Sequence, residues 1–408
     1  MATIDLPPDF RYDEVQFYEE DGPPRIPPGH LGVLAKFKGR FKGTGFNTIF
    51  RPNSGPPPRG TPFPHPVQPT PPNFPSDNVL ELNLTRETIT FCDKSLGNVP
   101  NRGFRHQDDI NLDGVPYVQA VNDVTNRRTG KGDHHPTGIH FETGLWMNIP
   151  ATHRNPILED SLVRMASIPH GTTINAQSFK PVSTMQGPPN ILPVSLKPFP
   201  VGQPHKKLHL HSLNIERTKT PRLPQHLEKF NAAGTITQDI LDDPNTVLRN
   251  SIIGQNIIET TVFTVSTDPP LPEFGGGTAN IAFLEGSARH PNHAPPIPPI
   301  HPNSKVIKME ATFWVETVEY SLTVPVFKPG QAPMEISAPE SPSGQPRPVF
   351  LVSPPYEITS PKTINVTSTQ IQYSQVVFMN FDQITWPHVS VSTLVPSTPV
   401  PVPDSVWG

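Results

Sequence analysis

The stretch that decides the fold class is Gly39-Arg-Phe-Lys-Gly-Thr-Gly-Phe-Asn47, which places three glycines and two phenylalanines in a segment with the pattern of a long β-strand. Glycine weakens the interior of a strand, so its repeated use indicates sharp curvature, a bulge or the close approach of another backbone. The first strand of a barrel that binds small ligands has these requirements. We therefore expect a β-barrel whose first strand covers about Val33 to Phe50.

Proline is unusually abundant and indicates long connections. The chain of 408 residues contains 57 prolines, far above the usual frequency of roughly one in twenty. Because proline has no amide hydrogen for a helix or a sheet, it belongs in loops, strand starts and edges. The prolines cluster in tracts at Pro23–Pro28, Pro56–Pro75, Pro188–Pro204, Pro291–Pro302 and Pro396–Pro403.

Composition also excludes several classes of partner. The formal net charge is −4, and no block of lysine or arginine forms a phosphate-binding stripe, so a nucleic-acid partner is not expected. No window holds the roughly 18 apolar residues of a membrane span, and the start of the chain lacks the pattern of a signal peptide. A cytoplasmic location is expected. With Cys92 as the only cysteine, neither an intrachain disulfide nor a cysteine-based zinc site can form.

Strand patterns recur along the chain and are separated by turns and loops rather than long helices. After the first strand they cover Val79–Thr85, Thr88–Cys92, Val115–Val121, Gly138–Ile149, Leu162–Ile168, Thr172–Ala176, Leu208–Ile215, Gln255–Ser266, Ala279–Leu284, Val306–Val324, Thr363–Phe381 and Val389–Val395. One helical pattern, Ile240 to Ile253, has Pro244 placed for a helix start near Asn245. Roughly a dozen strands with one or two short helices are typical of an all-β sandwich or barrel.

The domain organisation follows from these patterns. Residues 1–30 are predicted to form a flexible arm, because they are acidic and then proline-rich. Residues 31–395 are predicted to form a single elaborated barrel domain, with 180–205 as an alternative point of division. Residues 396–408 are predicted to form a proline-rich tail.

The chain also resembles a known group of proteins. The stretch 39–47 resembles the opening Gly-x-Trp-x-Gly-x-Gly strand of nitrobindin-type barrels, with Phe41 in place of tryptophan. Further segments carry a broader resemblance: Leu80–Thr85, Pro100–Gly103, Gly144–Thr152, Val163–Gln177, Ala311–Thr317 and Trp386–Val391. Together they resemble a poorly characterised lipocalin-like (calycin) family of bacteria and fungi, sometimes described as heme-binding. The resemblance implies an antiparallel calycin barrel whose lumen holds a small hydrophobic ligand, with heme as one candidate.

Candidate ligand-binding residues lie on the segment Gly138–Ile149. Period-two alternation places His140, Glu142, Trp146 and their neighbours of the same parity on one face. This face lines a semi-polar lumen or faces solvent, and Trp146 favours the lumen because tryptophan is usually well buried.

Two further histidines lie at strand ends. A Pro-His-Gly corner holds His170 on a stiff turn, where it ligates iron, transfers a proton or caps strand ends. His388 follows Trp386 and Pro387 directly before the last predicted strand. In nitrobindin-like barrels one histidine holds the heme, so the resemblance makes His170 or His388 the candidate ligand. The sequence leaves open the choice between them, and a packing or capping role for both.

A weak candidate for a metal site is the segment Leu208–Ile215. Its predicted strand places His209 and His211 on one face, which suits a divalent metal. The adjacent Lys206 and Lys207 favour the alternative of an exposed edge strand.

These residues support two hypotheses on function, and whether the protein is an enzyme stays open. The first is intracellular binding of a small hydrophobic molecule by His140, Trp146, His170, Trp386 and His388. The alternative is a cyclase or isomerase of secondary metabolism that uses the same lumen, with His170 or Glu142 as the acid–base group. A scaffold role for the proline-rich loops ranks last, because few Pro-x-x-Pro units carry flanking basic residues.

Overall fold

The computed structural model describes residues 29–51, 79–168, 170–178, 180–216, 227–269, 275–286, 302–341 and 344–407. The predicted arm over residues 1–30 lies outside the described residues except for its last two positions. The proline tract at 56–75 lies entirely outside them.

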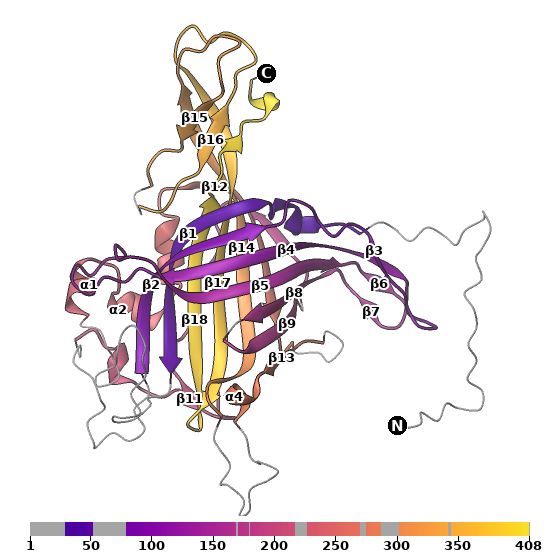
Figure 1. Cartoon of the computed structure of the whole chain (residues 1–408), viewed down its shortest axis with the longest axis vertical. Helices are drawn as coiled ribbons and strands as arrows, with labels where there is room; N and C mark the ends of the chain where they lie inside the picture. Colours follow the sequence, from indigo (N-terminus) through magenta and orange to yellow (C-terminus); the bar gives the residue numbers. More distant parts are fainter. Residues whose placement is uncertain are drawn as a thin grey trace, which may run out of the picture.

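A closed, antiparallel barrel of ten strands forms the centre of the molecule (Figure 1). Around the ring the strands are β12 (Asn256–Ser266), β14 (Lys305–Val324), β17 (Lys362–Phe381), β18 (Ile384–Pro396), β1 (Gly39–Arg51), β2 (Val79–Phe91), β4 (Ile110–Asp123), β5 (Thr137–Ile149), β8 (Ser161–Ile168) and β9 (Thr172–Ser178). The ring closes where Ser178 and Gln177 of β9 pair with Val265 and Ser266 of β12. The all-β, calycin-like barrel predicted from the sequence is confirmed.

Short strands extend this sheet or form small sheets beside it. β3 (Val99–Asn101), β10 (Ser183–Gln186), β11 (Phe199–Pro200) and β13 (Gly277–Asn280) pair with β4, β12, β18 and β9 respectively. β6 (Thr152–His153) and β7 (Ile157–Leu158) form a two-stranded sheet, and β15 (Met334–Ser337), β16 (Val349–Val352) and β19 (Val400–Pro401) form a three-stranded one.

The glycines of β1 serve the close approach of a neighbouring backbone. β1 lies between β2 and β18 in the ring. A Cβ atom at Gly43 would lie 1.9 Å from the carbonyl oxygen of Thr393, and one at Gly45 would lie 2.0 Å from that of Val391. Both partners belong to β18, so any larger residue would push the first and last strands of the barrel apart. This was one of the three purposes that the sequence indicated.

The beginning of the first predicted strand differs from expectation. Gly32–Lys36 forms a 3₁₀ helix, η1, and β1 begins only at Gly39. Leu34 and Phe37 are buried among the aromatic residues of the barrel interior. The apolar pattern of this segment is compatible with either a strand or a short helix. In the structure it is a 3₁₀ helix that packs Leu34 and Phe37 into the barrel interior.

Short helices lie beside the barrel wall and the small sheet. They are α1 (Glu228–Ala232), α2 (Gln238–Asp242), α3 (Thr246–Ser251), α4 (Ala282–Glu285) and the 3₁₀ helices η2 (His211–Leu213) and η4 (Asp404–Val406). The predicted helix at Ile240–Ile253 is divided at Asp243 and Pro244 into α2 and α3, and Asn245 is the N-cap of α3 as expected. Among the described residues, no helix has both the length and the apolar character that crossing a bilayer requires.

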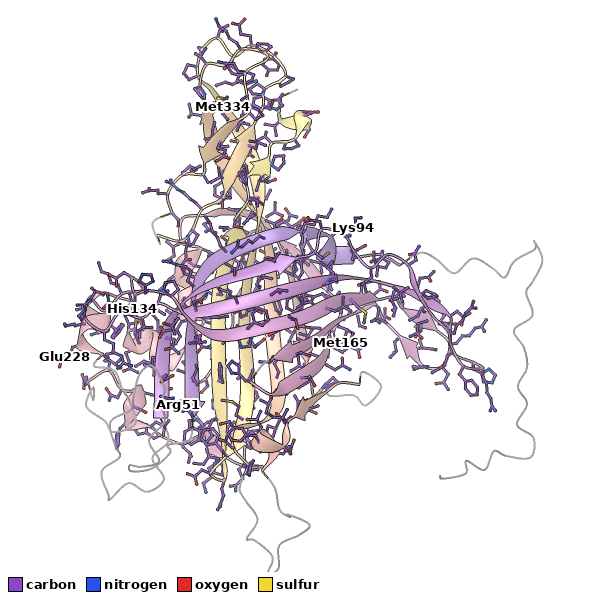
Figure 2. The ribbon with its side chains drawn as sticks, viewed as in Figure 1. Arg51, Lys94, His134, Met165, Glu228 and Met334 are labelled. Carbon is purple, nitrogen blue, oxygen red and sulfur yellow. The ribbon has the colours of Figure 1, made fainter. Side chains whose placement is uncertain are left out.

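Three apolar clusters hold these layers together. The first fills part of the barrel lumen. The second packs helices α1 to α3 against the barrel wall and also includes Phe50, Val306 and Met379 of the strands. The third joins the small sheet of β15, β16 and β19 to the projecting ends of β14 and β17. Figure 2 shows Met334 in the small sheet near the top of the view and Arg51 at the end of β1 in its lower part.

The predicted C-terminal tail is part of the third cluster. Its prolines flank β19, which pairs in parallel with β16. Trp407 is buried against the same cluster. The tail therefore completes the small sheet.

Candidate functional site

A cavity of about 220 Å³ lies in the barrel lumen next to the packed aromatic cluster. Side chains of β1, β4, β5, β14, β17 and β18 line it, together with the turn after β8. It brings together His140, His170 and His388, which are far apart in the sequence. Three of the five predicted ligand-binding residues thus lie on one cavity.

Alternation on β5 places the predicted residues inward. Glu142 and Trp146 are fully buried, and the His140 side chain is 22% exposed at the cavity. The intervening Phe141 is exposed on the outer face. The predicted lumen-facing side of β5 is correct, but only His140 reaches the cavity, because Glu142 and Trp146 lie successively deeper.

Glu142 is the acidic end of a buried ion pair. Its Oε1 atom lies 2.7 Å from Nη2 of Arg164 and also accepts a hydrogen bond from the Tyr117 hydroxyl. Its Oε2 atom accepts a hydrogen bond of 3.2 Å from Nε2 of His140. Burial alone would raise the pKa of Glu142, but the Arg164 charge and the hydrogen bonds of His140 and Tyr117 outweigh it and hold the pKa at about 2. Glu142 is therefore an ionised carboxylate at neutral pH.

Arg164 connects this pair to both walls of the lumen. Its Nε donates to the Tyr117 hydroxyl at 2.8 Å and its Nη1 donates to Oε1 of Gln375 at 2.7 Å. Its guanidinium also lies 5.7 Å from the ring centre of Trp146, within reach of a cation–π interaction. Trp146 thus supports the buried arginine from below and does not line the cavity.

Glu87, on β2, is a second buried carboxyl group in the lumen. It accepts hydrogen bonds of 2.7 Å from the Tyr373 hydroxyl and 2.6 Å from Nε2 of Gln119. No arginine or lysine forms a recorded ion pair with it among the residues that the structure describes. Burial raises the pKa of Glu87 to about 7, although the hydrogen bonds of Tyr373, Gln119 and Ser392 act in the opposite direction. Of the two carboxyl groups in the lumen, Glu87 therefore keeps its proton to a higher pH than Glu142 does.

His388 lies on the wall formed by β18. Nδ2 of Asn47 donates to Nε2 of His388 at 2.9 Å and to Oγ of Ser390 at 2.6 Å. Desolvation, and then the positive charge that His140 or His170 would carry, lower the pKa of His388 to about 3. Near neutral pH His388 is an uncharged hydrogen-bonding group.

His170 lies on the turn between β8 and β9, at the open side of the cavity. His170 is exposed to solvent, and the centre of its ring lies 5.6 Å from the centre of the His140 ring. Desolvation and the neighbouring His140 lower the pKa of His170. The Pro-His-Gly corner thus places an imidazole beside the cavity, as the sequence indicated.

Trp386 does not line the cavity. Its ring stacks on Phe381 at 5.1 Å and lies 4.9 Å from Phe50, which is a lining residue. Its Nε1 donates to the carbonyl oxygen of Phe381. Trp386 therefore packs against the lining residue Phe50, and it lies within β18 rather than before the last strand.

The predicted metal-binding strand at Leu208–Ile215 is not formed. His209 is exposed in an irregular segment, and His211 begins the 3₁₀ helix η2. Their rings lie perpendicular to each other at 5.5 Å. Nowhere in the described parts of the chain do three or more His, Cys, Asp or Glu side chains gather in a group able to hold a metal ion.

The sequence analysis did not single out Glu87 or Arg164. Each has inward-facing apolar neighbours two positions away, Ile89 for Glu87 and both Leu162 and Ala166 for Arg164. A charged residue in step with apolar ones on a strand was the signal that could have identified both.

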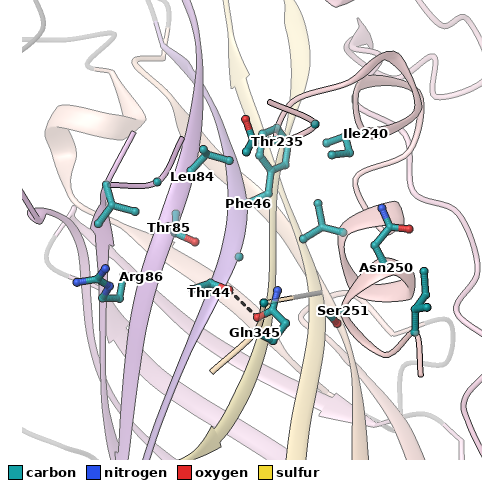
Figure 3. Close-up of a pocket in the computed structure, with 17 residues that line it drawn as sticks. Thr44, Phe46, Leu84, Thr85, Arg86, Thr235, Ile240, Asn250, Ser251 and Gln345 are labelled. Atoms are coloured by element: carbon teal, nitrogen blue, oxygen red, sulfur yellow. Dashed lines mark hydrogen bonds between the residues drawn. The ribbon is translucent and has the colours of Figure 1, made fainter. Parts of the chain in front are cut away.

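A larger groove of about 610 Å³ lies outside the barrel, between the wall and helices α2 and α3 (Figure 3). Apolar side chains such as Phe46, Leu84 and Ile240 line it, and Thr44 donates a hydrogen bond of 2.6 Å to Gln345 across one side. Its single titratable lining residue among those described is the exposed Arg86. The lumen cavity, with several coupled titratable groups, is therefore the better candidate site.

Comparison of the chain with protein-family models, with curated proteins and with solved structures gave no match in any of the three.

Proposed function

We propose that the barrel binds a small, uncharged, partly apolar molecule in the lumen cavity. The observation that supports this most is the convergence of His140, His170 and His388 on one cavity inside a closed barrel. Closed barrels whose side chains do not fill the lumen commonly hold ligands there.

The lining explains the expected polarity of the ligand. Apolar side chains such as Ile139, Val377 and Met379 alternate with hydrogen-bonding ones, so the walls suit an apolar body that carries a few polar atoms. The charged lining residue Arg51 is already paired with Glu81 at 2.7 Å. A ligand with a net charge would lack a counter-charge inside the lumen.

The size of the cavity limits the ligand. A volume of about 220 Å³ is below the roughly 300 to 1,000 Å³ of pockets for drug-sized molecules. A heme exceeds that room. In addition, Nε2 of His388 and Nε2 of His140 already form hydrogen bonds with Asn47 and Glu142. The residues present therefore do not fit a heme in the lumen.

Titration of the purified protein with hemin should produce no saturable change in the visible absorption spectrum that depends on these histidines. A stoichiometric shift of the main heme band, lost in His388→Ala or His170→Ala, would contradict this expectation and restore heme as the ligand.

Binding of 2-naphthol, a small aromatic alcohol, tests the proposed function. We expect saturable binding to the wild-type protein, measured by naphthol fluorescence. Val377→Phe should weaken it at least tenfold, because the larger ring occupies part of the cavity.

The matched control is Val247→Phe, which adds the same ring to the outer groove. Loss of binding in this variant alone would place the ligand in the groove and contradict the proposal. No binding to the wild-type protein would also contradict it.

A further inference from the structure

The two carboxyl groups of the lumen differ in what surrounds them. Glu142 pairs with the Arg164 guanidinium at 2.7 Å, whereas the hydrogen-bond partners of Glu87 in the described part of the chain, Tyr373, Gln119 and Ser392, are neutral, and a charge on His140 would act on it only weakly. Both side chains are fully buried, with at most 1% of the residue surface exposed. An unpaired buried carboxyl group favours its protonated form, and a paired one favours its ionised form. Environments that separate two carboxyl groups in this way are typical of acid–base sites.

The ionised Glu142 determines which nitrogen of His140 is available. A carboxylate only accepts hydrogen bonds, so Nε2 of His140 carries the hydrogen that Glu142 receives at 3.2 Å. In the neutral ring the other nitrogen, Nδ1, is then unprotonated, and among the described residues it makes no hydrogen bond. Glu142 is thus a positioning residue that holds His140 in the tautomer of a base.

Protonation of Glu87 makes the hydroxyl hydrogen of Tyr373 available as a donor. When Glu87 carries a proton, it donates to the Tyr373 oxygen instead of accepting from it, across the same 2.7 Å. The Tyr373 hydroxyl hydrogen is then available to a molecule in the cavity, which Tyr373 lines. An uncharged hydroxyl backed by a neutral carboxyl group suits an oxygen that gains negative charge.

The base and the donor lie on opposite walls. Around the ring, β17 and β5 are separated by β18, β1, β2 and β4 on one side and by β14, β12, β9 and β8 on the other. His140 projects from β5 and Tyr373 from β17, and both line the cavity. A molecule bound there therefore lies between them.

We propose that the lumen is an acid–base catalytic site for small β,γ-unsaturated ketones or esters, an inference that rests on ligand binding as proposed above. Nδ1 of His140 removes a proton from the carbon between the carbonyl group and the double bond. The C–H electron pair forms a carbon–carbon π bond, the carbonyl π pair moves to oxygen, and the Tyr373 hydroxyl donates a hydrogen bond to that oxygen. His140 then returns the proton to the far carbon of the original double bond. The electron pair of that double bond forms the new C–H bond, the neighbouring carbon–carbon π pair moves over by one bond and the oxygen pair re-forms the carbonyl group, which gives the conjugated isomer. No oxidant, reductant or cofactor enters the balance.

Two probes test this inference. Nitrobenzisoxazole tests for a base next to a hydrogen-bond donor. When the base removes the ring C–H proton, a nitrile forms, the N–O bond breaks and the ring opens to a coloured phenolate. Cyclohex-3-enone reports the proposed substrate class, because its isomerisation to the conjugated enone changes the ultraviolet absorbance. We expect wild-type protein to convert both faster than buffer.

The expected losses identify the roles. His140→Ala should lower kcat/KM for nitrobenzisoxazole by about 100-fold or more, because it removes the general base. Tyr373→Phe should lower kcat by at least about tenfold and leave KM nearly unchanged, because it removes a donor that acts as charge develops. His106→Ala, which changes an exposed histidine outside the cavity, should keep the wild-type rate. Binding of 2-naphthol to each variant confirms that its cavity is intact.

The outcomes separate this inference from the proposed function. If naphthol binds but nitrobenzisoxazole is not converted, or if His140→Ala converts it at the wild-type rate, the catalytic inference is wrong and the binding function stands. Conversion of nitrobenzisoxazole without conversion of the ketone overturns the substrate class. If naphthol does not bind, both proposals are wrong.

Discussion

Replacement of Glu142 by glutamine is expected to lower the free energy of unfolding by about 3 to 5 kcal/mol. The carboxylate lies 2.7 Å from the guanidinium of Arg164, and the two side chains are 0% and 3% exposed. Removing one partner leaves the buried Arg164 charge in the lumen without its counter-charge. Urea denaturation followed by tryptophan fluorescence measures the change.

A double-mutant cycle isolates the ion pair. Glu142→Leu combined with Arg164→Met should be several kcal/mol more stable than the sum of the two single changes, because the double variant leaves neither charge unpaired. Arg102→Gln is the matched control, since Arg102 and Asp109 pair at 3.0 Å with side chains 75% and 35% exposed. This change should cost less than about 1 kcal/mol. Additive effects of the Glu142 and Arg164 changes would show that the pair has no special role.

Replacement of Glu316 by glutamine is expected to stabilise the protein at alkaline pH. Glu316, on β14, is fully buried. Within the described ranges it accepts a hydrogen bond of 2.6 Å from Nε2 of Gln370, and its Oε1 atom has no hydrogen-bond partner there. Burial raises the pKa of Glu316 to about 8, with the Gln370 hydrogen bond acting in the opposite direction. The burial of the nearby Tyr320, and then the negative charge of Glu316, raise the pKa of Tyr320 to about 12.

The direction of the pH dependence follows from the raised pKa. Between the ordinary value of 4.5 and about 8, folded Glu316 keeps a proton that the unfolded chain has lost. The stabilisation is therefore complete below pH 4.5 and is lost as the pH rises through about 8. Glutamine carries no titrating proton, so Glu316→Gln should exceed the wild type by on the order of 3 to 5 kcal/mol at about pH 9. At about pH 4 the two should be nearly equal.

Urea denaturation of both proteins at these two pH values measures the effect. Glu335→Gln, which changes an exposed side chain of the small sheet, is the control and should give the same difference at both. A Glu316→Gln difference that does not grow with pH would show that Glu316 is ionised at little cost in the folded protein.

The barrel was predictable because its signals are local. Alternation along β5 showed that His140, Glu142 and Trp146 share a face, and the glycines of β1 indicated a close neighbouring strand. A helix start near Asn245 also depended on residues adjacent in the sequence.

Alternation did not reveal which side of the wall a buried face occupies. Leu80 and Leu82 of β2 are buried outside the barrel against the helices, whereas Ile89 of the same strand is buried in the lumen. Both faces of this strand carry apolar residues along part of its length. The pattern therefore predicts that a face is buried, but not whether it faces the lumen or the outer helices. The strand predicted at Leu208–Ile215 was wrong for a related reason. Its apolar residues Leu210, Leu213 and Ile215 pack in the second apolar cluster, but the segment forms no strand.

The polar partners in the lumen depend on residues far apart in the chain. Tyr373 and Glu87 are separated by 286 positions, and Arg164 and Gln375 by 211. Neither residue of such a pair signals the other locally. Whether they come into contact depends on the order of the strands around the barrel, which no single segment of the sequence specifies.

The pairing of β1 with β18 determines when this protein can fold during synthesis. Phe41 pairs with Pro396 and Asn47 with Ser390, so β1 needs a partner strand that lies 343 positions further along the chain at Asn47. Until the ribosome has released that strand, the edge of β1 that carries Gly43 and Gly45 has no partner, and the ring stays open. Such long sequence separations slow folding and leave an exposed strand edge in the growing chain. We therefore expect the growing chain to be prone to aggregation until β18 has been synthesised.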